Sequence, residues 1–322
     1  MRTEKFKAVV ECVASMTEAQ LDQLVAAVEQ RRVQTKALRI LETARDPKTC
    51  LHCGSATVVK NGHSCGLQRY RCRACKKTYN ATTGTPLAGL HRKERFFQQG
   101  ACLAEGLTVR QAAAELGVAT STAFRLRHRF LTAVVAHQPT NVSGLLEADE
   151  TYFRESQKGV RGLRRKARAR GGKAEVSKSK KDLVPVLIGQ VRGSHQVTDR
   201  VLTAMTADQA ADALRSVVGP DTLLCTDGSG AFRKAAAGLG VAFKSIAVSY
   251  DGRVQGGVYH VQTVNNYHQR LRGWVNGELR GVSTKYMPNY LAWMRTREWF
   301  KDQGVKPEHF VLSGLGQQLI NR

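Results

Sequence analysis

The 322-residue chain is long enough to bury a sizeable core and to hold one large domain with smaller modules. A hydrophobic content of 42% is ordinary for a globular protein and excludes a chain dominated by low-complexity disorder. The 50 Lys and Arg residues outnumber the 26 Asp and Glu residues, so the formal net charge is +24. Such a charge attracts polyanions, and nucleic acid is therefore the first partner to expect.

The sequence has no apolar run of about 18 residues and no secretory signal, so we expect no membrane partner. The expected location is the cytoplasm, in association with the nucleoid. Thiols stay reduced there, and the eight cysteines are interpreted as metal ligands and core residues, not as disulfides.

Residues 1–45 are predicted to form a helical region. Thr17 and Gln20 have the spacing of a capping box at a helix start. One helical stripe carries the apolar residues Leu21, Leu24, Val25 and Val28. We expect this stripe to pack within the protein, with self-association as the alternative use.

Residues 46–90 are predicted to form a zinc ribbon. Two Cys-x-x-Cys pairs, Cys50 with Cys53 and Cys72 with Cys75, are separated by short strand-like runs. This arrangement is typical of a structural zinc site with four thiolate ligands, and soft thiolates favour Zn²⁺ over Mg²⁺ or Ca²⁺. Several basic residues surround the second pair and suggest a phosphate-facing surface: Arg69, Arg71, Arg73, Lys76 and Lys77.

Residues 91–138 are predicted to form a helix-turn-helix DNA-binding domain. One helix is expected to end near Leu116, Gly117 marks the turn, and a second helix begins near Thr120. In the usual docking geometry the second helix enters the major groove. The side chains expected in the groove are Thr120, Ser121 and Arg125, and those expected near the DNA backbone are Arg127, His128 and Arg129.

Residues 142–322 are predicted to form an α/β domain with a ribonuclease-H-like mixed sheet and flanking helices. Strand patterns lie at 143–153, 182–193 and 195–205, with a hairpin turn at Gly193–Ser194. Helices and strands then alternate through residue 274. The resulting order βββαβαβα begins with an antiparallel meander, which purely alternating folds do not.

Residues 154–181 interrupt this order with 12 Lys and Arg residues against two Glu residues. Almost no large apolar side chain is present, so the segment is predicted to be a mobile basic insertion after the first strand. Its charge predicts contact with the DNA backbone, and Arg164, Arg165 and Lys166 are its candidate DNA-binding residues.

Two aspartates are candidate metal ligands. Asp149 is expected at the end of the first strand, and Asp227 follows the fourth strand. These strands are neighbours in a ribonuclease-H-like sheet, so both carboxylates would lie at one end, where their repulsion requires hard divalent cations. Asn265, near the start of a late helix, could bring an amide oxygen to the same point. His268 and Arg272 lie on the same helix face as Asn265.

On these residues the chain resembles the insertion-sequence transposases of the DDE type that carry an N-terminal zinc ribbon and helix-turn-helix and use Asn as the third catalytic residue. The resemblance covers about residues 45–300, through the cysteine pairs, "EADETYF", "CTDGSGAF" and "HVQTVNNYHQRLRGWV". It implies that Asp149, Asp227 and Asn265 hold two Mg²⁺ or Mn²⁺ ions for DNA strand cleavage and strand transfer. It also implies a catalytic cation at Arg272, where this group usually has Lys, and double-stranded DNA at element ends and targets as the partner of a homo-oligomer.

Several alternatives remain open at this point. Asn266 competes with Asn265, and Glu147 or Glu150 could replace Asp149 as the carboxylate ligand. His268 is a candidate polar group near the reacting phosphate. The chain could also be an inactive DNA-binding regulator derived from a transposase, or a nuclease without strand transfer.

Overall fold

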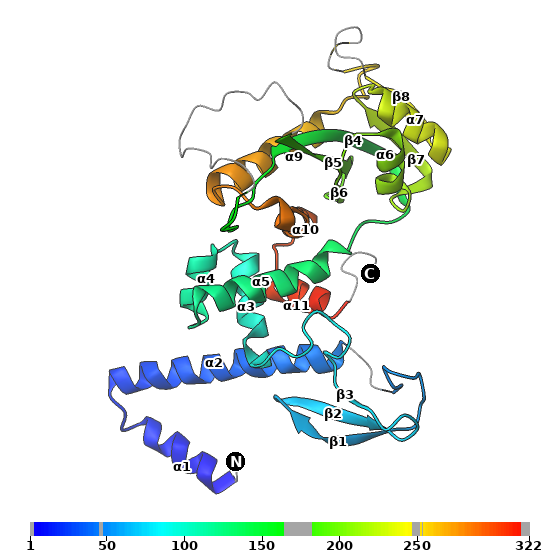
Figure 1. Ribbon diagram of the computed structural model, residues 1–322. Helices are drawn as coiled ribbons and strands as arrows, with labels where there is room; N and C mark the ends of the chain where they lie inside the picture. Colours follow the sequence, from blue (N-terminus) through cyan, green and yellow to red (C-terminus); the bar gives the residue numbers. More distant parts are fainter. Residues whose placement is uncertain (1–2, 45–47, 164–181, 247–251, 253, 317–322) are drawn as a thin grey trace. The chain divides into compact units, whose positions relative to one another are not determined.

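The computed structural model describes residues 3–44, 48–163, 182–246, 252 and 254–316. The chain forms two compact units, seen with their helices and strands in Figure 1. The first unit contains Met1–Leu126 and Lys306–Gln317, and the second contains Arg127–Val305 and Gln318–Arg322. Part of the expected domain of residues 142–322 therefore lies outside the second unit, because helix α11 (Pro307–Gly314) packs within the first unit.

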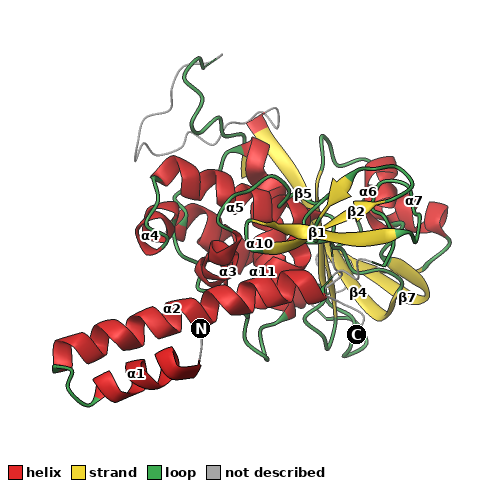
Figure 2. Cartoon of the chain, turned by 90° about the horizontal axis from the view of Figure 1, so that it is seen from below, coloured by secondary structure: helices red, strands yellow, loops and turns green. Residues whose placement is uncertain are grey.

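The first unit begins with two helices, α1 (Thr3–Val13) and α2 (Glu18–Thr43), joined by a short turn (Figure 2). The predicted capping box is confirmed, since the Thr17 N–H donates to Gln20 Oε1 at 2.9 Å. The expectation that the apolar stripe of α2 packs within the protein is wrong for Val25 and Val28, which are 55% and 44% exposed. The buried residues of α2 are confined to its C-terminal half.

That C-terminal half of α2 packs with α3 (Phe96–Ala104) and α11, after a short 3₁₀ turn, η1 (Lys93–Arg95). Their core contains the buried side chains Ala37, Leu41, Phe96, Leu103, Phe310 and Val311. A Cβ at Gly100 would lie 2.5 Å from the carbonyl oxygen of Pro307, so only glycine allows α3 and α11 to approach this closely. Lys36 and Glu308 form an ion pair across the same contact at 2.5 Å.

A small antiparallel sheet of β1 (Val58–Ser64), β2 (Leu67–Cys72) and β3 (Thr78–Tyr79) belongs to the same unit. It contacts α2 through Gln68, whose N–H donates to Glu42 Oε1 at 3.0 Å. The strands are short and expose much of their surface, so their own apolar core is small.

The predicted helix-turn-helix is formed by α4 (Val109–Glu115) and α5 (Thr120–Val135). Gly117 has φ +58°, the left-handed conformation that a tight helix-to-helix turn requires. Thr108 caps α4 by accepting from the Gln111 N–H. The core of the motif is a cluster of Cys102, Ala112 and Leu116, with Leu107, Val118 and Leu126 packed against it.

The second unit is built on a five-stranded mixed sheet with the order β6-β5-β4-β7-β8. Its strands are β4 (Val142–Arg154), β5 (Leu183–Val191), β6 (Val197–Val201), β7 (Val218–Thr226) and β8 (Ala242–Ser245). β4, β5 and β6 pair antiparallel, while β4 with β7 and β7 with β8 pair parallel. The predicted order of strands and helices is confirmed.

The central strand β4 has one apolar and one polar face because side chains alternate along a strand. Leu146 and Ala148 are buried in the main apolar core, where α6 (Ala207–Leu214) and α7 (Gly230–Leu239) pack side by side (Figure 1). Glu147, Asp149 and Thr151 point to the opposite face. That polar face contacts α9 (Gln262–Gly273).

The polar face is also covered by α10 (Met287–Trp299), which contacts β6. Arg295 on α10 pairs with Asp199 on β6, and both side chains are buried. Between α9 and α10 lie a π-helical turn, η3 (Trp274–Glu278), and a 3₁₀ turn, η4 (Thr284–Tyr286). Trp274, Tyr290 and Trp293 form an aromatic cluster there.

The basic insertion begins directly after β4, and its candidate DNA-binding residues Arg164, Arg165 and Lys166 lie outside the described residues. Lys158, in its described part, donates to the carbonyl oxygens of Leu279, Arg280 and Gly281. Across the described ranges, none of the helices combines the length and the hydropathy needed to cross a membrane.

Candidate functional site

The parallel pairing of β4 with β7 brings Asp149 and Asp227 level with each other. The last pair in this ladder is Glu147 with Cys225, and each aspartate comes two residues later on its strand. Asp227 follows the end of β7 directly, whereas Asp149 lies inside β4 and pairs with Ile188 of β5. The prediction of neighbouring strands is confirmed, but the prediction that Asp149 ends its strand is wrong, because β5 extends the pairing to Arg154.

The turn after Asp227 is tight. A Cβ at Gly228 would lie 2.4 Å from Ser245 Oγ, and its φ of +87° also favours glycine. The Ser229 N–H donates to Asp227 Oδ1 at 3.1 Å, which holds the carboxylate at the strand end. Asp227 therefore has a fixed position beside β4.

The electrostatics of Asp149 are those of a crowded, half-buried carboxylate. Burial, together with the neighbouring Asp227 and Glu150 carboxylates, raises the pKa of Asp149 to about 7. The Glu150 N–H donates to Asp149 Oδ1 at 2.9 Å and opposes this rise. The group thus holds a negative charge poorly unless a cation compensates it.

Helix α9 runs along the polar face of β4 and touches three successive residues of that face. Glu147 accepts from the N–H groups of Thr263 and Val264 at 2.8 and 3.2 Å. One turn later His268 Nδ1 lies 3.6 Å from Asp149 Oδ2. One turn later again, Arg272 Nε donates to Thr151 Oγ1 at 2.7 Å.

The regular spacing of these contacts has a geometric origin. Two residues of a strand rise about 6.6 Å. Four residues of an α-helix rise about 6 Å. Every second residue of β4 therefore meets every fourth residue of α9, and the two elements stay in step over the length of the site.

Asn265 and Asn266 lie on different sides of α9. The helix begins at Gln262, so Asn265 is in its first turn and is not its capping residue. Asn265 is exposed and shares its helix face with His268 and Arg272. Asn266 instead accepts from Arg270 Nε at 3.0 Å, and both residues line a cavity of about 870 Å³. Asn265 therefore lies on the face of α9 whose His268 contacts Asp149, whereas Asn266 lies on the face that lines the cavity.

Glu147 is fully buried, with 0% of its surface exposed. Its carboxylate also accepts from Thr263 Oγ1 at 2.8 Å and from Arg192 Nε at 2.8 Å. Because its oxygens are occupied by these donors, the alternative in which Glu147 replaces Asp149 as a ligand is not supported. Glu147 instead caps the start of α9. The sequence contains one signal for this capping role: Val261, the residue before α9, has no side-chain acceptor for the helix N–H groups.

His268 is buried, with 3% of its surface exposed. Burial, together with the nearby Arg272 guanidinium, lowers the pKa of His268 to about 4. At neutral pH the imidazole is uncharged, so its contact with Asp149 is a polar contact and not an ion pair. Arg272 is exposed at the end of the same face, where it can meet a phosphate.

The four predicted zinc-ligand cysteines form one cluster. The sulfur atoms of Cys50, Cys53, Cys72 and Cys75 all lie within 4.8 Å of one another. The Sγ–Sγ distances of Cys50 to Cys75 and of Cys53 to Cys72 are both 3.7 Å. A tetrahedral ion with metal–sulfur distances of about 2.3 Å requires ligand separations of about 3.8 Å, so this donor set fits Zn²⁺.

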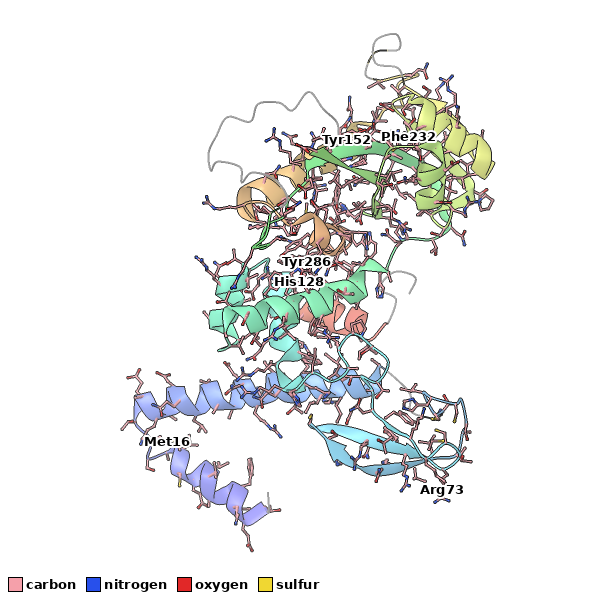
Figure 3. All side chains as sticks on the ribbon, viewed as in Figure 1. Met16, Arg73, His128, Tyr152, Phe232 and Tyr286 are labelled. Carbon is pink, nitrogen blue, oxygen red and sulfur yellow. The ribbon has the colours of Figure 1, made fainter. Side chains whose placement is uncertain are left out.

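Backbone N–H groups also point at these sulfurs. The His52 N–H donates to Cys50 Sγ and the Cys75 N–H to Cys72 Sγ, at 3.4 and 3.5 Å. The Cys75 N–H lowers the pKa of Cys72 to about 6, which favours the thiolate that a metal ion requires. Arg73 lies at the same end of the small sheet (Figure 3).

The helix-turn-helix presents some of the predicted DNA-binding residues and buries others. Thr120, Ser121 and Arg125 are exposed along the N-terminal part of α5, and Arg129 is exposed further on. The prediction that Arg127 and His128 lie near the DNA backbone is wrong, since both are buried. The Arg127 guanidinium lies 4.8 Å from the centre of the Trp293 ring.

His128 lies next to Tyr286 (Figure 3), and the centres of their rings are 4.1 Å apart. The sequence pattern failed here because Arg127 and His128 fall on the covered side of α5, whereas Arg129 falls on its exposed side.

The fold and the paired aspartates define a protein with a mixed α/β domain that could hold divalent cations, together with a helix-turn-helix. Residues 141–298 match the family model of an ISXO2-like transposase domain, and residues 101–134 match a homeodomain-like domain. The chain is therefore similar to ISXO2-like transposase domains in its second unit and to homeodomain-like domains over the helix-turn-helix.

Comparison with known proteins found one curated relative and structural matches of low similarity. The chain is 27% identical, over 282 residues, to a Halobacterium salinarum protein named "Uncharacterized protein in transposable element ISH50". That alignment covers 82% of this chain and 90% of the relative. A chain in the cryo-EM structure of the simian T-cell lymphotropic virus intasome with PP2A regulatory subunit B56 gamma aligns with a TM-score of 0.31 and 12% identity, covering 62% of this chain and 68% of that chain. A TM-score this low supports no statement about fold or function.

Proposed function

We propose that this protein is the DNA transposase of an insertion sequence. It binds the terminal inverted repeats of its element and catalyses DNA strand cleavage and strand transfer. The observation that carries the proposal is the level placement of Asp149 and Asp227 on neighbouring strands inside the residues that match the ISXO2-like transposase domain. The homologue in transposable element ISH50 supports the same class.

The strand order supports a ribonuclease-H-like catalytic domain. The first strand, β4, lies at the centre of the five-stranded sheet. The antiparallel strands β5 and β6 lie on one side of it, and the parallel strands β7 and β8 lie on the other. The proposed catalytic site is formed by Asp149, Asp227 and Asn265, with His268 and Arg272 on the same face of α9. The order Asp, Asp and Asn along the chain is the one that the resemblance to DDE-type transposases implies.

The donor set of the proposed site suits two Mg²⁺ or Mn²⁺ ions. Two carboxylates and an amide offer hard oxygen ligands, and the raised pKa of Asp149 indicates a site that lacks positive charge. A pair of such cations would supply Lewis acidity to phosphate oxygens during strand cleavage and transfer. Asp149 and Asp227 would hold them, Asn265 would complete the ligand set, and Arg272 would contact a substrate phosphate.

His268 has a positioning part in this proposal. It is neutral at physiological pH and packs against Asp149, so it fixes the carboxylate without competing with cations. Glu150 is not part of the proposed ligand set, because it is next to Asp149 in the sequence and its side chain therefore points to the other face of the sheet.

The DNA-reading part of the proposal combines three surfaces. The exposed residues Thr120, Ser121 and Arg125 of α5 would read the repeat in the major groove. The zinc ribbon, held by its four cysteines, would present a basic surface to phosphates. The basic insertion with Arg164, Arg165 and Lys166 would follow the DNA backbone. Bringing two element ends together requires at least a dimer, and the expected location is the cytoplasm at the nucleoid.

The test is metal-dependent cleavage of a labelled duplex that carries one element end. Wild-type protein should nick the duplex with Mg²⁺ or Mn²⁺ and join the new 3′ end to target DNA, whereas Asp227→Ala should do neither. Equal results for both proteins would favour the DNA-binding regulator. Cleavage without any joining would favour a nuclease that does not transpose.

A further inference from the structure

The segment that leads into α9 is held by an ion pair between the partly exposed Arg192 and the buried Glu147. Arg192, in the turn between β5 and β6, donates to Glu147 Oε1 through Nε at 2.8 Å and through a terminal nitrogen at 2.6 Å. The same guanidinium donates to the carbonyl oxygens of Val258 and His260, the residues that lead into the helix. Arg192 therefore joins the start of α9 to the sheet.

Glu147 completes this arrangement from the other side. The first N–H groups of a helix have no partner within the helix and need an external acceptor. Val261, the residue before α9, supplies none. Glu147 accepts from the N–H groups of both Thr263 and Val264, and its negative charge is favoured at a helix N-terminus.

We infer that Glu147 is a positioning residue whose buried carboxylate fixes where α9 lies along β4, and so sets the height of Asn265 and His268 relative to Asp149. This inference rests on the proposed function, because it concerns the same catalytic site. A helix that slipped by one residue would shift about 1.5 Å along its axis and turn by about 100°, which would carry Asn265 away from the site.

The geometry supports a fixed register. The capping contact of Glu147 is the first of three contacts in step between β4 and α9, and it is the one with the most hydrogen bonds. The Glu147 carboxylate is also fully buried, whereas Arg272 of the third contact is exposed. Asp149 lies two residues further along the same face.

The experiment compares full-length Glu147→Ala and Glu147→Gln with Asp199→Asn. Asp199→Asn is the matched control, since it also removes a buried carboxylate paired with an arginine in the same unit, but on β6 and α10. Amide hydrogen exchange is measured in metal-free protein over residues 261–272. The Mg²⁺ concentration for half-maximal cleavage is measured on the element-end duplex.

Glu147→Ala should raise amide exchange at the start of α9 by at least about tenfold. It should also raise the Mg²⁺ requirement by roughly 10- to 100-fold, as expected when a group that orients metal ligands is lost. Glu147→Gln keeps one acceptor oxygen and should lie between Glu147→Ala and wild type. Asp199→Asn should lower the melting temperature but leave both the α9 exchange and the Mg²⁺ requirement unchanged.

The inference is overturned if Glu147→Ala exchanges like wild type at the start of α9. It is also overturned if Asp199→Asn shifts the Mg²⁺ requirement as much as Glu147→Ala does, since that result would reduce Glu147 to general stability. The exchange measurement needs neither DNA nor cleavage. If Asp227→Ala instead cleaved like wild type, the proposed function would fail while the exchange result still tested the register.

Discussion

Asp149 is a partly buried carboxylate beside a second carboxylate, and its negative charge lowers the stability of the folded protein when no cation is present. Its pKa is raised from an ordinary value near 4 to about 7. Between these two pH values the folded protein binds a proton that the unfolded chain has already released. The contribution of Asp149 to the free energy of unfolding therefore decreases as pH rises through this window and is least favourable above about pH 7.

Asp149→Asn should accordingly stabilise the metal-free protein at pH 8, by on the order of 1–3 kcal/mol, and change little near pH 4. Thermal melts in the presence of a chelator at pH 4, 6 and 8 measure the effect. Adding Mg²⁺ should raise the melting temperature of wild type but not of the variant. A variant with the same melting temperature as wild type at pH 8 would contradict the raised pKa.

Two arginines of α5, two residues apart in the chain, should behave in opposite ways. Arg127 is 1% exposed and lies over Trp293, so Arg127→Ala should cost about 2–4 kcal/mol of stability. Arg125 is exposed, so Arg125→Ala should change stability by less than about 0.5 kcal/mol. It should instead weaken binding to the element end by about 1–3 kcal/mol.

Urea denaturation and DNA-binding titrations of both variants separate the two roles. If Arg125→Ala bound the repeat as tightly as wild type, the assignment of this helix face to the major groove would fail.

At the scale of elements, the small sheet β1–β3 should depend on its metal ion. Its apolar core is limited to a few residues, so zinc binding should supply much of its stability. Cys72→Ser should lose zinc and unfold the sheet. Cys65→Ser is the matched control, because Cys65 is exposed in the turn between β1 and β2. Metal analysis and limited proteolysis should find zinc and an intact sheet in the control, and neither in Cys72→Ser.

Elements were predictable from the sequence where local patterns decide them. The strands of the second unit, the turn at Gly117 and the cap at Thr17 follow from alternation, glycine conformation and side-chain acceptors, which act over a few residues. The neighbouring placement of β4 and β7 also followed, because the order of strands and helices restricts the topology.

The missed features depend on contacts between distant segments. The β5 pairing that puts Asp149 inside its strand comes from residues about 40 positions later. The capping of α9 by Glu147 joins residues more than 100 positions apart. Arg127 is buried beside the indole of Trp293, and no local sequence pattern predicts this contact between distant residues. Each depends on which face of an element another element covers.

At the scale of the whole molecule, the net charge of +24 makes DNA binding a salt-dependent property. If the chain neutralises about six to ten phosphates, its DNA affinity should fall roughly 10³- to 10⁵-fold between 50 and 200 mM salt. Replacing Arg164, Arg165 and Lys166 together by alanine should reduce the slope of log affinity against log salt by about 3. Binding titrations over this salt range measure both slopes, and an unchanged slope would remove the insertion from the DNA interface.

Helix α11 has a consequence for synthesis. Phe310 and Val311 complete the core around α2 and α3, although more than 170 residues separate them from the helix-turn-helix in the chain. On the ribosome, the unit that is translated first therefore stays unfinished until residues 307–314 have emerged. A prematurely terminated chain that lacks these residues would expose to solvent the apolar side chains of α2 and α3 that Phe310 and Val311 cover.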